Sequence, residues 1–452
     1  MSDKRSANAA NDIDLLQDLI ARARKAGADA ADAILFEGVS VSHARRLGKT
    51  EKLERSESQD LGLRVFVGRQ QAIASSSDRS AKALAELVER AVDMARAVPE
   101  DPFCGLADPG EIVREWPSLE MLDPSEPGAE VLIERARAVE ETALAVSGIT
   151  NSEGAEAGWG ESRVAMAASN GFAGGYQGSN HGVSVSVIAG SGTAMERDYD
   201  FSSAVFAADL RDPAAVGREA GERAVKRLGA RKMPTCRCPV VFDPRVARSF
   251  LSHLLGAING PSIARGTSFL KDRLGERIFP EAITIVDDPH RPRGLRSKPF
   301  DGEGIANRRR RLIDKGVLTT WLLDLRSARQ LGLKTTGHAA RGTASPPSPA
   351  STNVWIEPGA VSPAELMADI DSGLYVTELM GMGVNGVTGD YSRGAAGFWI
   401  EKGQLAFPVS EMTVAGNLKD MFARLRAASD LEFKSGVDAP TLRIDDLTVA
   451  GA

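Results

Sequence analysis

The chain has 452 residues, too many for one ordinary hydrophobic core, so two domains are expected. Its 55 lysines and arginines against 61 acidic residues give a formal charge of -6, which argues against direct contact with nucleic acid. Only three cysteines, no secretory signal and no apolar run of about 20 residues predict a soluble cytoplasmic protein with no membrane contact.

The first half of the chain alternates helical and strand patterns twice. Residues 1–11 are polar and predict a disordered tail, and Asp12 is expected to cap a helix that ends near Gly27. Two short strands follow over residues 33–36 and 39–42, separated by Glu37-Gly38, and then a hairpin and a helix over residues 60–75 and 81–97. After a proline-rich connector, a helix, three strands and a helix are expected over residues 129–145, 165–168, 183–189, 199–206 and 213–228. This repeated order favours an internal duplication.

The segment from Arg231 to Pro234 is interpreted as the domain boundary, which gives domains over residues 12–232 and 233–452. In the second half, strand patterns cover residues 239–242, 283–286, 317–323, 353–356, 374–379 and 441–444. Helical patterns cover residues 244–258, 363–370 and 418–428. We therefore predict an α+β protein of two domains, an N-terminal domain of α/β layers and a β-rich mixed C-terminal domain.

Residues 383–417 form the stretch with the clearest strand signal and the most compact polar set. Apolar and small residues alternate there, and Glu401-Lys402-Gly403-Gln404 is expected to be a hairpin loop. Four polar residues lie between two glycines, namely Asp390, Tyr391, Ser392 and Arg393. Because glycine lets another backbone approach closely, these residues are candidates for contact with an extended peptide. A turn whose polar residues satisfy one another is the alternative interpretation.

Other candidate chemistry is weaker. No HExxH or GxSxG motif is present, and Cys236 and Cys238 lack the spacing of a zinc knuckle. A metal site assembled from distant residues, such as His253, Asp288, His290 and His338, is a less favoured alternative. The carboxylates of Asp301 and Glu303 are candidates for acid–base chemistry, but a turn is the favoured interpretation. The arginines of residues 308–311 are assigned to a solvated face or to pairs with nearby acids, with anion binding as the alternative.

Three strings in the C-terminal half resemble the PmbA/TldD family, and within it the PmbA (TldE) branch: PFDGEGIANRRRRLIDKGVL, NGVTGDYSRGAAGFWIEKG and FPVSEMTVAGNLKDM. The resemblance runs from about Ala33 to Ala450 and is most specific over residues 388–417. It implies a cytoplasmic bacterial system in which TldD and TldE subunits pair and degrade or trim unfolded peptides. The TldD subunit of such a pair carries zinc through an HExxxH helix and a later cysteine.

This chain departs from that zinc motif. The motif is expected near residues 251–256, where the chain has Leu251, Ser252, His253, Leu254, Leu255 and Gly256. If His253 is the first histidine, Leu254 replaces the acid and Ile258 the second histidine; if it is the second, Arg248 and Ser249 occupy the first two positions. Residues 430–440 contain no cysteine. We therefore expect no zinc in this chain, and zinc in its partner subunit.

The resemblance leaves three functional hypotheses. The first is a non-catalytic subunit that pairs with a TldD-like chain and shapes a chamber for unfolded peptide. The second is a stand-alone peptidase with a dispersed metal site, and the third is a gyrase-associated regulatory binding protein. When expressed alone, a surface built for a paralogue is expected to give a homodimer.

Overall fold

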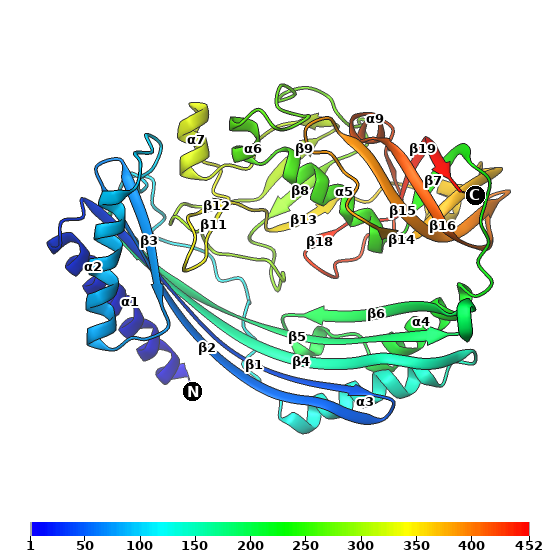
Figure 1. Ribbon diagram of the computed structural model, residues 1–452, viewed down its shortest axis with the longest axis horizontal. Helices are drawn as coiled ribbons and strands as arrows, with labels where there is room; N and C mark the ends of the chain where they lie inside the picture. The colour runs from blue at the N-terminus through cyan, green and yellow to red at the C-terminus, as the bar shows by residue number, and fades with distance from the viewer. Residues whose placement is uncertain (1, 452) are drawn as a thin grey trace.

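The computed structural model describes residues 2–451, with side chains from Asn11 onward. The first half of the chain builds one long curved sheet, and the second half lies against its concave side (Figure 1). The six strands are β1 (Ala30–Arg46), β2 (Lys49–Val67), β3 (Gln70–Ser76), β4 (Ile149–Ala168), β5 (Ala173–Ala189) and β6 (Glu196–Ala204). They are all antiparallel, in the order β3-β2-β1-β4-β5-β6.

Four helices cover the convex side of this sheet: α1 (Ser2–Lys25), α2 (Ala81–Ala97), α3 (Ala129–Leu144) and α4 (Pro213–Lys226). Leu16 and Leu87, on α1 and α2, pack against Leu63 at one end, whereas Val139 and Ala220, on α3 and α4, lie in a separate cluster at the other. The order helix, three strands, helix occurs twice, and β1 pairs with β4 where the two units meet. This arrangement is the one expected of a duplicated unit.

Three expectations for this half were wrong. The helix α1 begins at Ser2, so residues 2–11 belong to it rather than to a disordered tail; Met1 lies outside the described residues. Asp12 does not cap it, since its buried carboxylate lies 2.9 Å from the Arg163 guanidinium. Glu37-Gly38 does not break a strand either, because Gly38 pairs in register with Ser58 and with Ser162.

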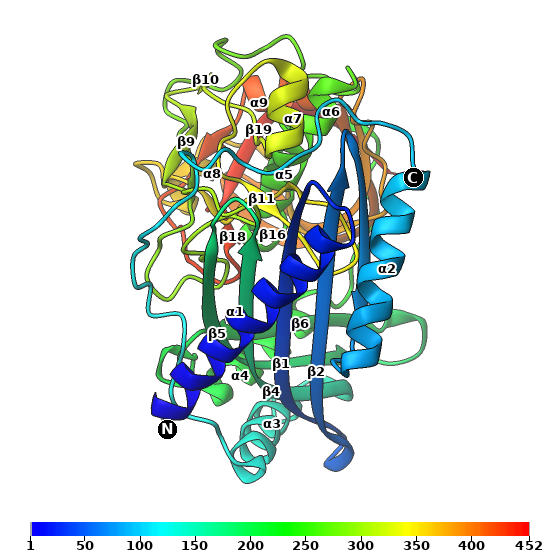
Figure 2. The same cartoon turned by 90° about the vertical axis from the view of Figure 1, so that its left-hand side faces the viewer.

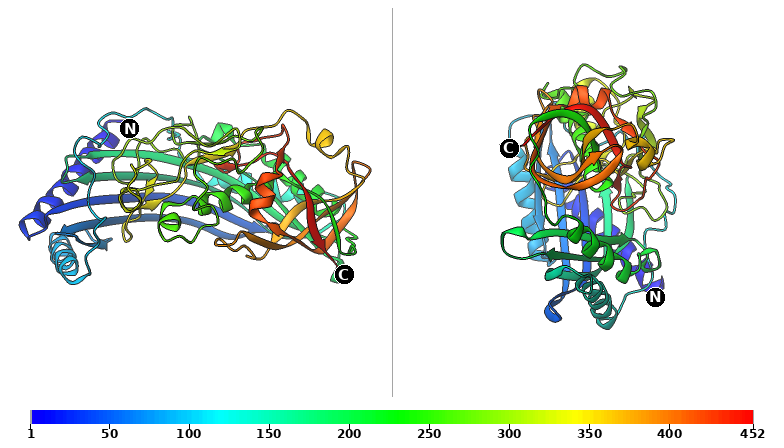
Figure 3. Two further views of the ribbon diagram at one scale, coloured as in Figure 1. Left: turned by 90° about the horizontal axis from the view of Figure 1, so that it is seen from above. Right: turned by 90° about the vertical axis from the view of Figure 1, so that its right-hand side faces the viewer.

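The second half contains a closed barrel, which Figure 3 shows end-on in its right-hand view. Its strands are β7 (Cys236–Phe242), β14 (Ser372–Met380), β15 (Asp390–Glu401), β16 (Gln404–Asn417) and β19 (Leu442–Ala450). Pairing of β16 with β19 closes the ring, and the short β17 (Arg426–Ala427) adds to β19. As predicted, β15 and β16 form a hairpin that turns at Lys402-Gly403.

The remaining short elements surround the barrel. A second sheet has the order β10 (Val317–Leu318), β9 (Arg310–Asp314), β8 (Ile285–Asp288), β13 (Asn353–Ile356) and β18 (Val437–Asp438), and β11 (Ala339–Ala340) pairs with β12 (Ser348–Pro349). The helices are α5 (Pro244–Ala257), α6 (Gly260–Ala264), α7 (Leu325–Leu331), α8 (Pro363–Met367) and α9 (Leu418–Ala423). Asp243 caps α5 by accepting a hydrogen bond from the backbone N–H of Arg245 at 2.9 Å.

Two kinds of contact join the halves. Ile34 and Met166, on the concave side of the sheet, pack with Phe300 and Leu325 from the second half. Buried charges lie beside this apolar contact: Arg64 and Arg341 both pair with Asp32. Burial alone would raise the pKa of Asp32, but the two guanidiniums lower it below its ordinary value.

Candidate functional site

A cleft of about 510 Å³ opens between the end of the curved sheet and the barrel. The sheet contributes β6 and the segment after α4, and the second half contributes the N-terminal part of α5 together with β14 and β15. Six arginines line the cleft, against two carboxylates: Arg197, Arg227, Arg245, Arg248, Arg296 and Arg393, with Asp198 and Glu378. The lining is therefore strongly positive although the whole chain is acidic.

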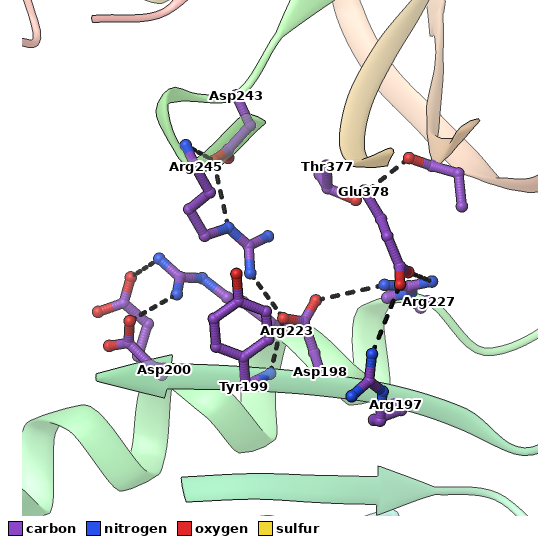
Figure 4. Close-up of polar contacts among 12 residues, drawn as sticks. Arg197, Asp198, Tyr199, Asp200, Arg223, Arg227, Asp243, Arg245, Thr377 and Glu378 are labelled. Carbon is purple, nitrogen blue, oxygen red and sulfur yellow. Dashed lines mark hydrogen bonds and ion pairs between the residues drawn. The ribbon is translucent and has the colours of Figure 1, made fainter. Parts of the chain in front are cut away.

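Three of these arginines form ion pairs that cross between the halves (Figure 4). Arg245 lies 2.6 Å from Asp198, and Arg227 lies 2.6 Å from Glu378, which Arg197 also approaches at 3.6 Å. Burial alone would lower the pKa of Arg245, but Asp243 and Asp198 raise it, so this guanidinium stays charged. Both carboxylates of the cleft are therefore already paired within the chain.

The other three arginines, Arg248, Arg296 and Arg393, have no carboxylate within ion-pair distance among the side chains that the structure describes. Arg393 donates to the backbone oxygen of Leu379 at 3.2 Å, and its Nε is buried with no hydrogen-bond partner. Guanidinium groups without a carboxylate suit a carboxylate or phosphate brought by a ligand.

The four residues proposed to contact peptide do not act as one set. Alternation along β15 places Tyr391 inside the barrel, where it is 2 % exposed, and leaves Asp390 and Ser392 on the outer side. Asp390 accepts hydrogen bonds from Thr388 at 2.6 Å and from Asn417 at 3.0 Å, as in the alternative interpretation of a self-satisfied turn. Of the four, only Arg393 lines the cleft.

Tyr391 instead packs against α5, at the segment where the zinc motif is expected. Its ring stacks on Phe250 at 6.0 Å and meets the His253 ring edge-on at 6.0 Å. The Tyr391 hydroxyl and His253 Nε2 are both buried with no hydrogen-bond partner. Burial, helped by the charge of Arg393, lowers the pKa of His253 to about 4, so its imidazole is neutral at pH 7.

This segment does not fit a zinc ion. The Leu251 side chain is buried in the barrel core, Gly256 has no side chain, and His253 contacts two aromatic rings. Among the side chains of residues 11–451, no three His, Cys, Asp or Glu come together as a metal site would require.

The other histidines of the dispersed-site hypothesis have protein partners. His338 lies 3.2 Å from Asp287 and shares a hydrogen bond with Thr336 at 2.8 Å. His290 Nε2 lies 2.7 Å from Asn307 Oδ1. Each of these two histidines is therefore held by its own partners, and among the described side chains His253, His290 and His338 do not form a metal-binding group.

The burial of two candidate acids could not be predicted from the sequence. Asp301 and Glu303 do form a turn, but both are buried, and burial raises their pKa values to about 6 and about 8. The neighbouring arginine run is as expected, since Arg309 and Arg311 approach nearby carboxylates. A turn pattern alone gives no sign of burial, which here comes from the contact between the two halves.

Family models and known proteins match almost the whole chain. The PmbA/TldA metallopeptidase models match as domain 1 over residues 31–95, as central domain over residues 122–228 and as C-terminal domain over residues 235–451. The metalloprotease PmbA of Escherichia coli O157:H7 is 38% identical over 426 residues, which cover 94% of this chain and 92% of that protein. This chain belongs to the PmbA/TldD family. The first two family domains fall on the two halves of the six-stranded sheet.

Solved structures of PmbA/TldD type share the fold. A candidate modulator of DNA gyrase from Bacteroides thetaiotaomicron is 30% identical with a TM-score of 0.90, covering 97% of this chain and 98% of that one. TldE from Thermococcus kodakarensis is 21% identical with a TM-score of 0.85, covering 97% and 100%. Among the helices of residues 2–451, none is long and apolar enough to cross a bilayer.

Proposed function

We propose that this chain is the non-catalytic, TldE-type subunit of a cytoplasmic TldD/TldE-like zinc metallopeptidase, in which it helps to hold unfolded peptide. The observation that carries the proposal is the segment of α5 over residues 251–256. With His253 as the first histidine of the motif, Leu254 replaces the acid and Ile258 the second histidine; with His253 as the second, Arg248 and Ser249 replace the first histidine and the acid. A segment with these residues cannot bind zinc or activate water through the family motif.

The proposed partner is a TldD-like chain that carries HExxxH, with a homodimer as the form adopted alone. The test is zinc content by elemental analysis together with hydrolysis of an unfolded peptide. We expect no zinc and no activity from the chain alone, and activity after mixing with its HExxxH-bearing paralogue. Stoichiometric zinc and activity in the chain alone would contradict the proposal and revive the dispersed metal site.

We place peptide holding at the arginine cleft, because Arg248, Arg296 and Arg393 lack carboxylate partners there. Their chemistry suits acidic side chains or the terminal carboxylate of a peptide. We expect Arg248→Gln to weaken binding of an acidic fluorescent peptide about tenfold, the loss of one charge-assisted hydrogen bond. Arg265→Gln is the matched control, since Arg265 is exposed and lies outside the cleft.

A gyrase-associated binding role is the second candidate, supported by the name of the relative from Bacteroides thetaiotaomicron. Co-purification of gyrase with this chain, combined with an inactive peptidase mixture, would favour that role. An active mixture with no gyrase retained would favour the peptidase subunit.

A further inference from the structure

The half of β2 from Lys49 to Asp60 has a neighbouring strand on one side only. β1 pairs along its inner side, whereas β3 covers only Leu61–Val67 on the outer side. In Figure 2 the hairpin of β1 and β2 extends below the end of α2. Every residue of this half is exposed, and within residues 2–451 no backbone hydrogen bond from another segment reaches its outer edge. Several of its charged side chains have partners within the chain, since Lys52 pairs with Glu54 and Arg55 pairs with Glu57 and Glu126.

A free strand edge is a template for pairing with another chain, and proteins usually protect it with charged side chains. Here the charges alternate in sign along the segment Lys49-Thr50-Glu51-Lys52-Leu53-Glu54-Arg55-Ser56-Glu57. Such a segment repels strands of uniform charge and accepts one with the opposite pattern. The sequence therefore restricts which partner can pair with this edge.

The segment is complementary to itself in one antiparallel register, centred on Leu53. In that register residue i lies opposite residue 106 − i of a second copy, so that the facing pairs are Lys52 with Glu54, Glu51 with Arg55, Thr50 with Ser56 and Lys49 with Glu57. Leu53, which is 52% exposed in the monomer, meets its own copy on the axis.

Neighbouring registers place like charges opposite each other. Moving the centre by one residue sets Glu51 against Glu57, or Lys49 against Arg55. If the axis passes between Leu53 and Glu54, Lys52 faces Arg55; if it passes between Lys52 and Leu53, Glu51 faces Glu54. Like charges directly opposite are destabilising, so one register is favoured over all four.

We infer that residues 49–57 of β2 are a pairing surface for a second copy of this chain, joined across a two-fold axis at Leu53 into one continuous sheet. Opposite charges then meet on both sides of the axis, and a free edge of each protomer is removed. This inference rests on the homodimer in the proposed function, and it does not depend on the roles proposed for zinc and peptide.

The axis is tested by a symmetric disulfide. Opposite residues of an antiparallel pair have Cα atoms about 4.5–5.5 Å apart, within the range that a disulfide spans. We expect Leu53→Cys to form a covalent dimer on mild oxidation of the full-length protein. Leu47→Cys is the matched control, because Leu47 is equally exposed at 52% but lies in the β1–β2 turn, away from the axis. Equal cross-linking of both variants would overturn the register.

The charge pattern is tested by reversal and rescue. In sedimentation, we expect Glu51→Lys alone or Arg55→Glu alone to raise the dimer dissociation constant about tenfold, since each places two like-charge pairs across the axis. The double variant E51K/R55E restores opposite charges and should return the constant to near the wild-type value. Because the double variant carries both changes, its recovery excludes misfolding as the cause of the single-variant losses.

A wild-type chain that is monomeric at tens of micromolar, or a double variant as weak as the single ones, would overturn the inference. So would pairing of this edge with the HExxxH-bearing chain in place of a second copy. A monomeric chain would also remove the homodimer from the proposed function, but none of these results decides the zinc and peptidase assay, so failure of the interface and failure of the proposed peptidase role are separable.

Discussion

Glu303 lies in the contact between the two halves, and burial together with the charge of Asp301 raises its pKa to about 8. Its Oε2 accepts a hydrogen bond from the backbone N–H of Leu325 at 2.8 Å. The Arg64 guanidinium lowers the pKa but does not offset burial. At neutral pH the folded chain therefore holds a proton on this side chain.

This proton makes stability depend on pH. Glu303 has a pKa of 4.5 as its ordinary value and about 8 when folded, so between these pH values the folded state binds more protons than the unfolded state. The free energy of unfolding should then fall as pH rises through this window. We expect Glu303→Gln to be less sensitive to pH from 5 to 8 in urea titrations. An unchanged slope in that variant would assign the pH dependence to other groups.

Substitution of Tyr391 tests whether its buried hydroxyl has a structural role. The hydroxyl has no hydrogen-bond partner, while the ring stacks on Phe250. We expect Tyr391→Phe to be neutral or to stabilise the fold by up to about 1 kcal/mol, because an unsatisfied polar group is removed. Tyr391→Ala should cost about 3–5 kcal/mol through the cavity it leaves. A loss of stability in Tyr391→Phe, measured by urea unfolding, would show that the hydroxyl is satisfied in solution.

At the scale of elements, sequence patterns predicted correctly those helices and turns whose bounds are set by neighbouring residues in the chain. The helix α2 has the predicted bounds because Ser80 caps it and its apolar residues repeat at helical spacing. The hairpin of β15 and β16 was also predicted correctly, since period-two alternation and a glycine turn are local signals. Glu37-Gly38 resembles a turn, yet Arg79 and Arg163 pair with Glu37 from elsewhere in the chain and the strand continues.

The candidate site was predictable only in part. The sequence shows that the zinc motif is absent, and it identifies Arg393 as a candidate for ligand contact. The cleft depends on Arg245 meeting Asp198 and on Arg227 meeting Glu378, pairs that only the folded chain brings together. The period-two pattern of β15 did indicate that neighbouring residues face opposite sides, a signal that argued against grouping Asp390 with Tyr391.

Two glycines offer a matched comparison between elements. A Cβ on Gly397 of β15 would lie 1.9 Å from the backbone oxygen of Tyr375 on β14, so Gly397→Ala should cost about 1–3 kcal/mol or more through displaced strands. A Cβ on Gly256 of α5 meets nothing within 4 Å, and Gly256→Ala should stabilise the helix by about 0.5–1 kcal/mol. Thermal unfolding of both variants checks the opposite signs. A stable Gly397→Ala variant would show that β14 and β15 can separate without cost.

At the scale of the whole molecule, two groups of buried charges fix how the curved sheet sits against the barrel. One group, around Asp32, lies beside the apolar contact of the two halves, and the other, around Asp198, lies at the cleft. The Arg231–Pro234 segment joins the halves near the second group, and Arg231 and Lys232 are exposed. Charge pairs of this kind orient two bodies more than they stabilise them, because desolvation offsets much of their attraction.

Substitution of Asp198 and of Asp200 distinguishes the orientation of the two halves from the stability of the fold. Both side chains are buried on β6, and each pairs with arginines. Asp198 reaches Arg245 across the cleft, whereas Asp200 pairs with Arg211 at 2.7 Å and Arg223 at 3.0 Å within its own half. Each change to asparagine should lower the free energy of unfolding by about 1–3 kcal/mol.

Only Asp198→Asn should loosen the two halves, and we expect faster tryptic cleavage at residues 231–232 in that variant under native conditions. Asp200→Asn should be cut at the wild-type rate at these sites despite a similar loss of stability, because its pairs do not cross the cleft. Cleavage that followed stability alone, with both variants cut equally fast, would mean that the apolar contact around Phe300 holds the halves by itself.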